Sequence, residues 1–480
     1  MRETRNQLFV DGRWTEAVSG LRSPVFNPAT GEQIATVPGG GREDARLAVE
    51  AACAAFLPWS QTPAEERSAY LRKIYDLIVA DADRLAEIMT LEQGKPVKEA
   101  KGEVLWGAEF FLWYAEEAKR IYGEIVPPSR ATQRILVQRQ PIGVVAAITP
   151  WNFPSSMITR KLAPALAAGC TAVIKPAPET PLSAIALFEL FEKAGLPPGV
   201  ANLVIGDAQE IGREFLENDK VRKISFTGST PVGKHLLEQS AKQVKRVSLE
   251  LGGHAPFIVF PDADLERAAN DLLYNKFQNN GQTCICANRI FVHESIAETF
   301  TELFVRKMSK VTVGNGLQDV DVGPLIHERA LAKVEGHVRD ALAKGARLAA
   351  GGTRLTEGEY AKGAFYAPTV LTGVTDRMDV FREETFGPVA PFISFRTEDE
   401  VVRMANDTPY GLAAYIYTKD LATTMRVADR LEYGMIGINE SALGYVQAPF
   451  GGIKQSGFGR EGGRQGVDAF LEYKYLNLNF

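Results

Sequence analysis

The sequence predicts an α/β protein organised around a doubly wound parallel sheet, and two observations lead to this prediction. First, between residues 143 and 260 short apolar runs of strand length alternate with segments that carry helical apolar spacing. Strands that alternate with helices pair in parallel through crossover connections. Second, the 480 residues are 45% hydrophobic and 24% charged, an ordinary globular composition that suggests two or three domains.

The individual elements follow from local patterns along the chain. Residues 7–14 (QLFVDGRW) predict a hairpin that turns at Asp11-Gly12. Apolar spacing predicts helices at 42–56, 65–89 and 99–121. In the alternating region, strands are predicted at 143–149, 171–175, 201–205, 223–227, 247–251 and 256–260. Helices are predicted between most of these strands, at about 155–168, 181–194, 208–217 and 230–242. A second set of alternating elements is expected from about 262 to 450.

Two further segments alternate apolar and polar residues, as exposed strands do: 134–140 (RILVQRQ) and 473–480 (YKYLNLNF). Both have the character of edge strands. An unpaired strand edge presents free backbone donors and acceptors, so each segment needs a partner. We therefore expect these segments to take part in assembly of the chain into a homodimer or a homotetramer.

Charge and apolar content exclude several classes of protein. The formal net charge of −5 is spread along the chain without long blocks of like charge, so no basic segment is expected to bind nucleic acid or an anionic membrane. The longest nearly apolar run, 162–174, is too short for a bilayer, which needs about 20 residues. The N-terminus has no apolar stretch like a secretory signal. We expect a soluble, cytoplasmic protein whose partner is a small molecule.

The four cysteines do not form the framework of a disulfide-rich domain, and no metal site is expected. Cys53 and Cys170 lie in Ala-rich or apolar stretches and are expected to be small buried side chains. Cys284 and Cys286 differ because their surroundings are polar and contain glycine. Cys284 ends the segment Gly281-Gln282-Thr283-Cys284, where a turn would expose a reactive thiol; a merely structural cysteine is the alternative.

Two polar residues at predicted strand ends could take part in acid–base or oxyanion chemistry. Glu250 is flanked by leucines in Leu249–Gly253, so partial burial would raise its pKa towards that of a useful general base. The alternative is a surface carboxylate. Asn152 opens a predicted helix within Pro150–Pro154, where its amide could donate to an oxyanion or could simply cap the helix.

Ligands of doubly wound sheets bind at the carboxyl ends of the strands, and two further segments fall there. Lys175 ends a predicted strand and could contact ribose hydroxyls or a phosphate. Gly228 and Ser229 follow another strand and begin a helix, whose N-terminus favours phosphate. No G-x-G-x-x-G segment follows a strand, so the common dinucleotide-binding fingerprint is missing.

Taken in order, these segments resemble the motifs of the aldehyde dehydrogenase superfamily. The matching segments are Pro150–Pro154 (PWNFP), Ile174–Pro176 (IKP), Phe226–Ser229 (FTGS), Leu249–Gly253 (LELGG), Gly281–Cys284 (GQTC), Glu383–Pro388 (EETFGP) and Pro449–Gly457 (PFGGIKQSG). The resemblance runs from about residue 7 to the C-terminus. It implies a dinucleotide-binding domain at 1–120 and 143–250, a catalytic domain at 251–454, and oligomerisation or bridging segments at 121–142 and 455–480.

The resemblance also implies roles for individual residues. Cys284 would attack the aldehyde, Asn152 and the Cys284 backbone N–H would hold the oxyanion, and Glu250 would activate water to release the acid. NADP or NAD would be the cofactor. Residues expected to bind it are Trp151, Lys175, Pro178, Gly228, Ser229, Leu251, Glu384 and Phe386. A relative that transfers the acyl group to CoA typically lacks the glutamate of Leu249–Gly253, so hydrolysis is favoured; a non-catalytic relative is the other alternative.

The most similar subgroup is the succinate-semialdehyde dehydrogenases, because Trp113–Glu117 (WYAEE), Ile158–Lys161 (ITRK) and Cys284–Arg289 (CICANR) resemble their segments. Gln278, however, stands where those enzymes usually carry a carboxylate-binding arginine, and no serine aligns near Tyr445. Oxidation of another aliphatic or aromatic aldehyde is thus the alternative. Residues expected to contact the aldehyde are Arg160, Phe153, Trp113, Gln278, Tyr445 and Phe450.

Two details concern cofactor choice and redox sensitivity. NAD-preferring relatives often carry a glutamate three residues after the lysine of Ile174–Pro176; here Pro178 stands there and Glu179 follows, so NADP is expected to be accepted. The alternative is that Glu179 binds the ribose and excludes NADP. The subgroup also includes members inhibited by a disulfide between the cysteines equivalent to Cys284 and Cys286; simple packing of Cys286 is the alternative.

Overall fold

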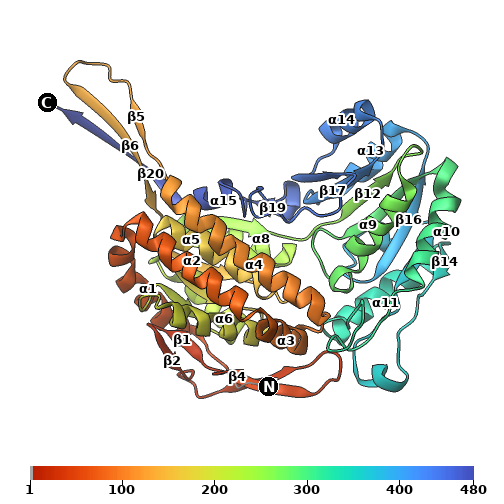
Figure 1. Cartoon of the computed structure of the whole chain (residues 1–480), viewed down its shortest axis with the longest axis horizontal. Coiled ribbons are helices and arrows are strands. Elements are labelled where there is room, and N and C mark those ends of the chain that lie inside the picture. The colour runs from red at the N-terminus through yellow and green to blue at the C-terminus, as the bar shows by residue number, and fades with distance from the viewer. Residues whose placement is uncertain (1–3) are drawn as a thin grey trace.

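Two sheets, each covered by helices, form the two halves of the molecule, and a narrow β-arm projects from one half (Figure 1). The computed structural model describes residues 4–480. The first half is made mainly by the N-terminal part of the chain and the second by residues beyond about 255. The functional segments of the sequence fall where these halves meet.

The first sheet has eight strands in the order β19-β11-β10-β7-β8-β9-β1-β2, and the strands β11, β10, β7, β8 and β9 run parallel. Their bounds are β1 (Leu8–Val10), β2 (Arg13–Thr15), β7 (Val144–Ile148), β8 (Thr171–Lys175), β9 (Ala201–Leu203), β10 (Val221–Thr227), β11 (Arg246–Glu250) and β19 (Gly457–Phe458). The crossover helices are α5 (Ser156–Ala168), α6 (Pro181–Ala194), α7 (Ala208–Glu217) and α8 (Thr230–Ser240). The predicted doubly wound sheet and the predicted N-terminal hairpin are confirmed.

The N-terminal helices differ from the prediction at one point. They are α1 (Arg42–Gln61), α2 (Ala64–Ala80), α3 (Ala82–Gln93) and α4 (Val97–Glu117), and a hairpin of β3 (Arg22–Phe26) and β4 (Gln33–Pro38) precedes them. The single helix predicted at 65–89 is therefore wrong. Asp81 leaves helical geometry (φ −108°, ψ 14°) and both ends α2 and precedes α3. The apolar spacing continues on both sides of Asp81, so periodicity alone does not reveal the break.

The second sheet has seven strands in the order β14-β15-β16-β13-β12-β17-β18. Their bounds are β12 (Ala255–Val259), β13 (Ala287–His293), β14 (Arg347–Ala350), β15 (Thr369–Thr372), β16 (Val389–Phe395), β17 (Ala413–Tyr417) and β18 (Met435–Ile438). Around it lie α9 (Leu265–Phe277), α10 (Ala297–Met308), α11 (Glu328–Ala343), α12 (Asp379–Arg382), α13 (Glu398–Asn406) and α14 (Leu421–Arg430). The strand predicted at 256–260 continued the series of the first sheet, but β12 pairs with β13 and β17 instead.

The chain is completed by short helical turns: η1 (Ala118–Arg120), η2 (Ala241–Gln243), η3 (Gln278–Gly281), η4 (Glu294–Ile296), η5 (Gly358–Lys362), η6 (Lys454–Ser456) and α15 (Gln465–Asp468). No helix within residues 4–480 is long and apolar enough to cross a membrane. Cys170 is buried, as expected, whereas Cys53 is exposed, so that expectation is wrong. Cys53 follows the buried Ala52 on α1, at the exposed edge of the helix face that packs against the core.

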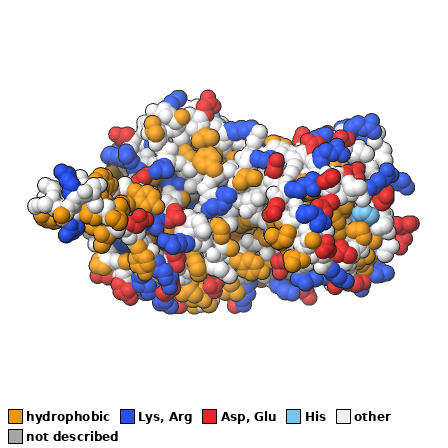
Figure 2. Space-filling view, turned by 90° about the horizontal axis from the view of Figure 1, so that it is seen from above, with side chains coloured by type: hydrophobic (Ala, Val, Ile, Leu, Met, Phe, Trp, Pro, Cys, Tyr) orange, Lys and Arg blue, Asp and Glu red, His pale blue; other side chains and the backbone are white. Residues whose placement is uncertain are grey.

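The arm consists of β5 (Glu124–Val126), β6 (Gln133–Pro141) and β20 (Leu471–Asn479), in the order β20-β6-β5. The two segments predicted to need partners pair with each other, antiparallel, from Leu471 opposite Pro141 to Asn479 opposite Gln133. In the described chain, the outer edge of β20 has no neighbouring strand. Hydrophobic side chains gather along the arm (Figure 2), including the exposed Ile125, Tyr473, Tyr475 and Phe480. The division of the chain into domains stays a prediction; β19, within 455–480, joins the first sheet.

Candidate active site

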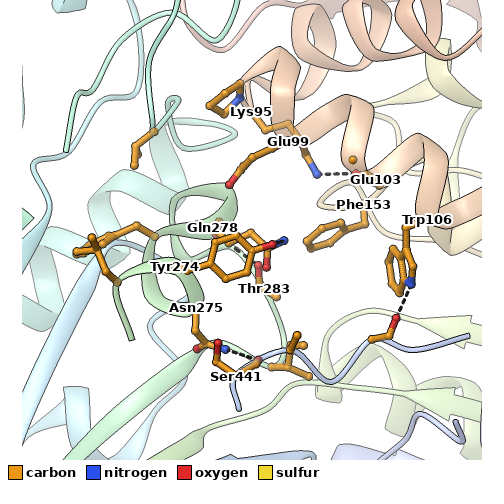
Figure 3. Close-up of a pocket in the computed structure, with 18 of the residues that line it drawn as sticks. Lys95, Glu99, Glu103, Trp106, Phe153, Tyr274, Asn275, Gln278, Thr283 and Ser441 are labelled. Atoms are coloured by element: carbon orange, nitrogen blue, oxygen red, sulfur yellow. Dashed lines mark hydrogen bonds and ion pairs between the residues drawn. The ribbon is translucent and has the colours of Figure 1, made fainter. Parts of the chain in front are cut away.

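A cavity of about 910 Å³ opens where the two halves meet (Figure 3). Cys284 is among the residues that line it. The cavity walls come from α4, the start of α5, α9 and the segment 441–445. Phe153, Arg160, Gln278, Tyr445 and Phe450, all expected from the sequence to contact a substrate, line the same cavity. The volume falls within the range of small-molecule sites.

The turn before Cys284 has an unusual backbone. Asn279, Asn280 and Gly281 have φ values of 48°, 57° and 73°, so three consecutive residues are left-handed. Asparagine tolerates this region better than most residues, and a Cβ at Gly281 would lie 2.2 Å from the Gly387 carbonyl oxygen. The Asn279 side chain holds the turn: its Nδ2 donates to the Asn152 carbonyl (2.8 Å), and its Oδ1 accepts from Gln93 (2.8 Å). The turn leaves Cys284 partly exposed on the cavity wall.

Asn152 is fixed against this turn from the opposite side. Its side chain is buried, and Nδ2 donates to the carbonyl oxygen of Gln282 at 2.9 Å. An amide nitrogen carries two hydrogens, so one remains for another acceptor. Because Gln282 stands two residues before Cys284, this bond positions the amide beside the nucleophile segment. The free hydrogen of the amide can therefore be donated to an oxygen on a substrate carbon that is bonded to the Cys284 sulfur.

A buried ion pair behind Asn152 was not predicted from the sequence. Lys95 Nζ donates to Glu103 Oε2 at 2.6 Å and to the Asn152 carbonyl at 2.7 Å. The other oxygen of Glu103 accepts from the backbone N–H groups of Ser155 (3.0 Å) and Ser156 (3.1 Å) at the start of α5. Lys95 stands between Gly94 and Pro96, which is typical of an exposed turn, so no sequence signal pointed to this pair.

Glu250 ends β11 as a buried carboxyl group. Its Oε2 has no hydrogen-bond partner within the described chain. Burial raises the pKa of Glu250 well above its ordinary value; Glu461 raises it further, while Arg160 and Lys161 oppose the rise. Gly451 has a φ of 155°, and a Cβ there would lie 2.8 Å from Glu250 Oε1 and 2.9 Å from the Gly459 carbonyl oxygen, so glycine is needed beside this carboxylate. A carboxyl group with a raised pKa and a free oxygen is suited to accept a proton from water.

The expected cofactor residues line the carboxyl edge of the first sheet. Gly228 and Ser229 lie between β10 and α8, and the Gly228 N–H donates to the Glu250 carbonyl at 3.0 Å. Ser229 precedes the first helical residue without capping α8 through its side chain, which leaves the helix N-terminus open to a phosphate. Leu251 packs against the same helix, because a Cβ at Gly233 would lie 2.4 Å from Leu251 Cδ2.

Lys175 is buried at the end of β8, and its Nζ donates to the neighbouring Pro176 carbonyl at 2.9 Å. Burial lowers the pKa of Lys175 to about 8, although Glu179 and Asp207 act in the opposite direction. Pro178 is exposed, and Glu179 is half-buried. A buried ammonium group with a single backbone partner fits a site for ribose or phosphate oxygens.

The second half contributes the other end of the expected dinucleotide site. Glu384 Oε1 accepts from the Gly253 N–H at 2.9 Å, and burial raises the pKa of Glu384 to about 7. Phe386 has a left-handed backbone (φ 56°), and its ring meets that of Trp151 edge-to-face at 5.6 Å. The residues described here thus offer contacts for the phosphates, the riboses and the nicotinamide ring, and they fit a dinucleotide.

The aromatic wall of the cavity differs in part from the expected one. Figure 3 shows the rings of Tyr274, Phe153 and Trp106 around the cavity. Trp113 lies on the same helix as Trp106, two turns further on, and is not among the residues that line the cavity. Trp106 takes the place expected for Trp113, and its Nε1 donates to the Gly444 carbonyl at 2.5 Å. Gln278 Nε2 donates to the Tyr274 hydroxyl at 3.3 Å.

Cys286 lies outside the cavity lining. It is buried, and its Sγ lies 3.6 Å from the Lys276 carbonyl oxygen, a weak hydrogen-bond contact. Both Cys284 and Cys286 are free thiols in this structure. The possibility of a disulfide between them stays a prediction.

Known proteins share this sequence and fold over almost the whole chain. Residues 14–476 match the aldehyde dehydrogenase family. A glutarate-semialdehyde dehydrogenase of Pseudomonas putida is 52% identical over 99% of this chain and 98% of its own. A succinate-semialdehyde dehydrogenase [NADP(+)] of Escherichia coli is 51% identical over 98% of this chain and 97% of its own. A crystal structure of an E. coli NADP-dependent enzyme has a TM-score of 0.98 at 51% identity, covering 99% of this chain and 98% of that one. The chain belongs to the aldehyde dehydrogenase family.

Proposed function

We propose that this protein oxidises an aldehyde to the carboxylic acid with NADP or NAD, using Cys284 as nucleophile and Glu250 as the base for hydrolysis. The observation that carries the proposal is that Cys284 lines the cavity, that Asn152 is tied to the Cys284 turn through Gln282, and that the charge of the buried Glu250 acts on the Cys284 thiol. The family membership supports it.

The residues act in a defined order. The Cys284 thiolate attacks the aldehyde carbon, and the resulting oxyanion accepts from the free Asn152 hydrogen and the Cys284 backbone N–H. A bound nicotinamide supplies the hydride acceptor, so the carbon attached to Cys284 becomes a thioester. Glu250 then takes a proton from water, and the water oxygen attacks the thioester carbon to release the acid. Retention of Glu250 favours hydrolysis over transfer of the acyl group to CoA.

For the cofactor, Lys175 would meet the adenosine ribose or its 2′-phosphate, and Gly228 and Ser229 would meet the pyrophosphate. Pro178 carries no charge to repel a 2′-phosphate, which favours acceptance of NADP. One relative is named for NADP(+), whereas a 37% identical betaine aldehyde dehydrogenase of Staphylococcus aureus was crystallised with NAD+. NADP or NAD is therefore the cofactor class.

The aldehyde is proposed to be a semialdehyde with an acidic tail, such as succinate semialdehyde. Relatives of 51–53% identity are named for glutarate semialdehyde, succinate semialdehyde, aspartate semialdehyde and 3-sulfolactaldehyde, all of which carry an acidic group. Arg160 is the guanidinium of the cavity wall. The second candidate is a neutral aliphatic or aromatic aldehyde, favoured by the neutral Gln278–Tyr274 pair and the aromatic lining.

Formation of NADPH or NADH, followed by absorbance, tests both candidates. Succinate and glutarate semialdehydes should give a higher kcat/KM than pentanal and benzaldehyde. The Cys284→Ala variant should abolish oxidation while the cofactor still binds. Oxidation by that variant at a rate close to wild type would refute the nucleophile, and a strict requirement for CoA would refute hydrolysis. Absence of turnover with every aldehyde would favour a non-catalytic relative.

We further propose a homodimer or homotetramer. The free edge of β20 and the exposed Ile125, Tyr473 and Phe480 on the arm support it, because paired edges and covered apolar side chains are favoured. Light scattering at micromolar concentration should show at least two copies. A monomer under those conditions would contradict the proposal.

A further inference from the structure

Four charged side chains form one buried cluster next to the cavity. Glu461 Oε1 accepts from Lys161 Nζ at 2.5 Å, and Glu461 Oε2 lies 3.0 Å from Arg160 Nη2. The charges of all three residues act on Glu250: Glu461 raises its pKa, and Arg160 and Lys161 lower it. Each of the four is less than a tenth exposed. The Arg160 guanidinium lies 4.1 Å from the centre of the Phe450 ring.

The two cations of the cluster are held differently. Lys161 has directed bonds, to Glu461 and to the Thr227 hydroxyl at 2.6 Å. Arg160 has few: its Nε and Nη2 make no hydrogen bond, since the contact with Glu461 is close but poorly aligned. Arg160 also lines the cavity, whereas Lys161 does not. The positive charge nearest the reaction space is therefore the one least satisfied by the protein.

The charges of the cluster do not balance when Glu250 is protonated. Burial disfavours ionisation of Glu461, but Lys161 and Arg160 outweigh it, so the pKa of Glu461 lies below its ordinary value. Glu461 is thus a carboxylate at neutral pH, and it compensates one of the two cations. Within this group of four, one positive charge remains while Glu250 holds its proton. Lys223 also lowers the pKa of Glu461, but it is buried and bonded to Ser248, and burial lowers its own pKa to about 7. Ionisation of Glu250 makes the cluster neutral.

Cys284 responds to the same charge. Burial raises the pKa of the Cys284 thiol to about 12; among the charged groups, Arg160 opposes this rise most, while Glu384 and Glu250 add to it. Glu384 is tied to the Gly253 N–H and acts throughout the reaction. Arg460 also favours ionisation of Glu250, but it is half-buried and bonded to the carbonyls of Gly452 and Gly459. Arg160 lines the same cavity as Cys284 and belongs to the same buried cluster as Glu250, so its charge acts on both groups.

We propose that Arg160 is a positioning residue that acts through Cys284 and Glu250. Its uncompensated positive charge stabilises the Cys284 thiolate before acylation and the Glu250 carboxylate after acylation. The proposal rests on the proposed function, because it assigns an order to the two ionisations of that reaction. It holds whether or not the aldehyde carries an acidic tail.

Protons balance through one turnover. Attack proceeds from the form of the site that has the Cys284 thiolate beside protonated Glu250. After hydride has left with its electron pair, the sulfur is bound in a neutral thioester, and Glu250 releases its proton to solvent. The Glu250 carboxylate then takes a proton from the attacking water. Collapse of the adduct releases the acid and restores the Cys284 thiolate beside protonated Glu250.

The first test measures ionisation of Cys284 without any aldehyde. The rate of iodoacetamide alkylation against pH should be followed at Cys284 by peptide mass spectrometry, because Cys53 is exposed as well. Arg160→Gln should slow alkylation at pH 7.5 about tenfold or more, the effect of one unit in pKa. Arg160→Lys should stay within about threefold of wild type, since it keeps the charge. Lys98→Gln, an exposed cation of the same cavity wall, is the matched control and should leave the profile unchanged.

The second test uses pentanal, which has no carboxylate for Arg160 to bind. Arg160→Gln should lower both the burst rate and the steady-state rate with pentanal about tenfold, and Arg160→Lys should restore them. If Arg160 acts only as a receptor for an acidic tail, its loss will raise KM for succinate semialdehyde and leave pentanal and alkylation unchanged. That result, or failure of Arg160→Lys to restore alkylation in a folded protein, overturns the proposal. Failure of wild type to oxidise any aldehyde instead refutes the proposed function, while the alkylation profile still decides the role of Arg160.

Discussion

Removal of Lys95 should damage both stability and catalysis, because one ammonium group joins two parts of the site. Lys95 contacts Glu103 at 2.6 Å and the Asn152 carbonyl at 2.7 Å, and it lies 4.0 Å from the centre of the Phe153 ring. Both Lys95 and Glu103 side chains are 1% exposed. Lys95→Met keeps most of the volume and removes the charge and the donors.

The magnitude follows from what is left behind. In Lys95→Met, Glu103 is a buried carboxylate without a counterion, and breaking a buried pair in this way costs about 3–5 kcal/mol. Glu103→Gln keeps an acceptor for the Ser155 and Ser156 N–H groups but has no charge. The double variant Lys95→Met/Glu103→Gln should therefore recover most of the lost stability. It should not recover kcat, because the Asn152 carbonyl keeps the bond from Asn279 but still lacks the bond from Lys95.

Thermal unfolding and the steady-state oxidation of one aldehyde should be measured for wild type, Lys95→Met, Glu103→Gln and the double variant. Together they separate the effect of Lys95 on stability from its effect on catalysis. A displaced Asn152 amide costs up to the value of one oxyanion donor, about 10²–10³ in kcat. Melting of Lys95→Met at the wild-type temperature would show that the pair does not stabilise the fold. Full kcat in the double variant would show that Lys95 does not position Asn152.

Three further predictions concern the base, the cofactor and the second thiol. Glu250→Gln should give a burst of NAD(P)H followed by slow turnover, because hydrolysis is blocked after hydride transfer; unchanged steady-state turnover would contradict the base. Burial lowers the pKa of Lys175 to about 8, so this side chain loses its positive charge as pH rises through that value. KM for NADP should rise as pH increases through about 8, KM for NAD should not, and Pro178→Glu should favour NAD in kcat/KM; equal pH profiles for both cofactors would argue against Lys175 as the phosphate partner. Cys286→Ala should lose the dithiothreitol-reversible part of inactivation by peroxide, and reversibility equal to wild type would exclude a disulfide with Cys284.

The sequence predicts the first sheet well because its signals are local. Each strand is a short apolar run, and each motif residue, such as Lys175 or Glu250, stands at a strand end where parallel topology brings such ends together. The placement of β12 in the second sheet has no such signal. Its apolar run resembles those before it, and only pairing with β13 and β17 distinguishes it.

The charged framework of the site could not be predicted for a different reason. Lys95 contacts the carbonyl of Asn152, and Lys161 pairs with Glu461 300 residues away. Neither partner stands in a local pattern that marks it as buried. The exchange of Trp113 for Trp106 is similar, because both lie on α4 at helical spacing and only packing against the 441–445 segment selects one of them.

The groups that make bonds and the side chains that shape the cavity come from different elements of the chain. The groups assigned to bond making come from the end of β11, the Pro150–Pro154 segment and the turn before Cys284, whereas Trp106, Tyr274 and Tyr445 come from α4, α9 and the 441–445 segment. A substitution in the second group alters the shape offered to the aldehyde tail and leaves the backbone of the first group in place. Selection or laboratory evolution can therefore vary recognition while chemistry is retained. Relatives at about half identity are named for several different acidic aldehydes.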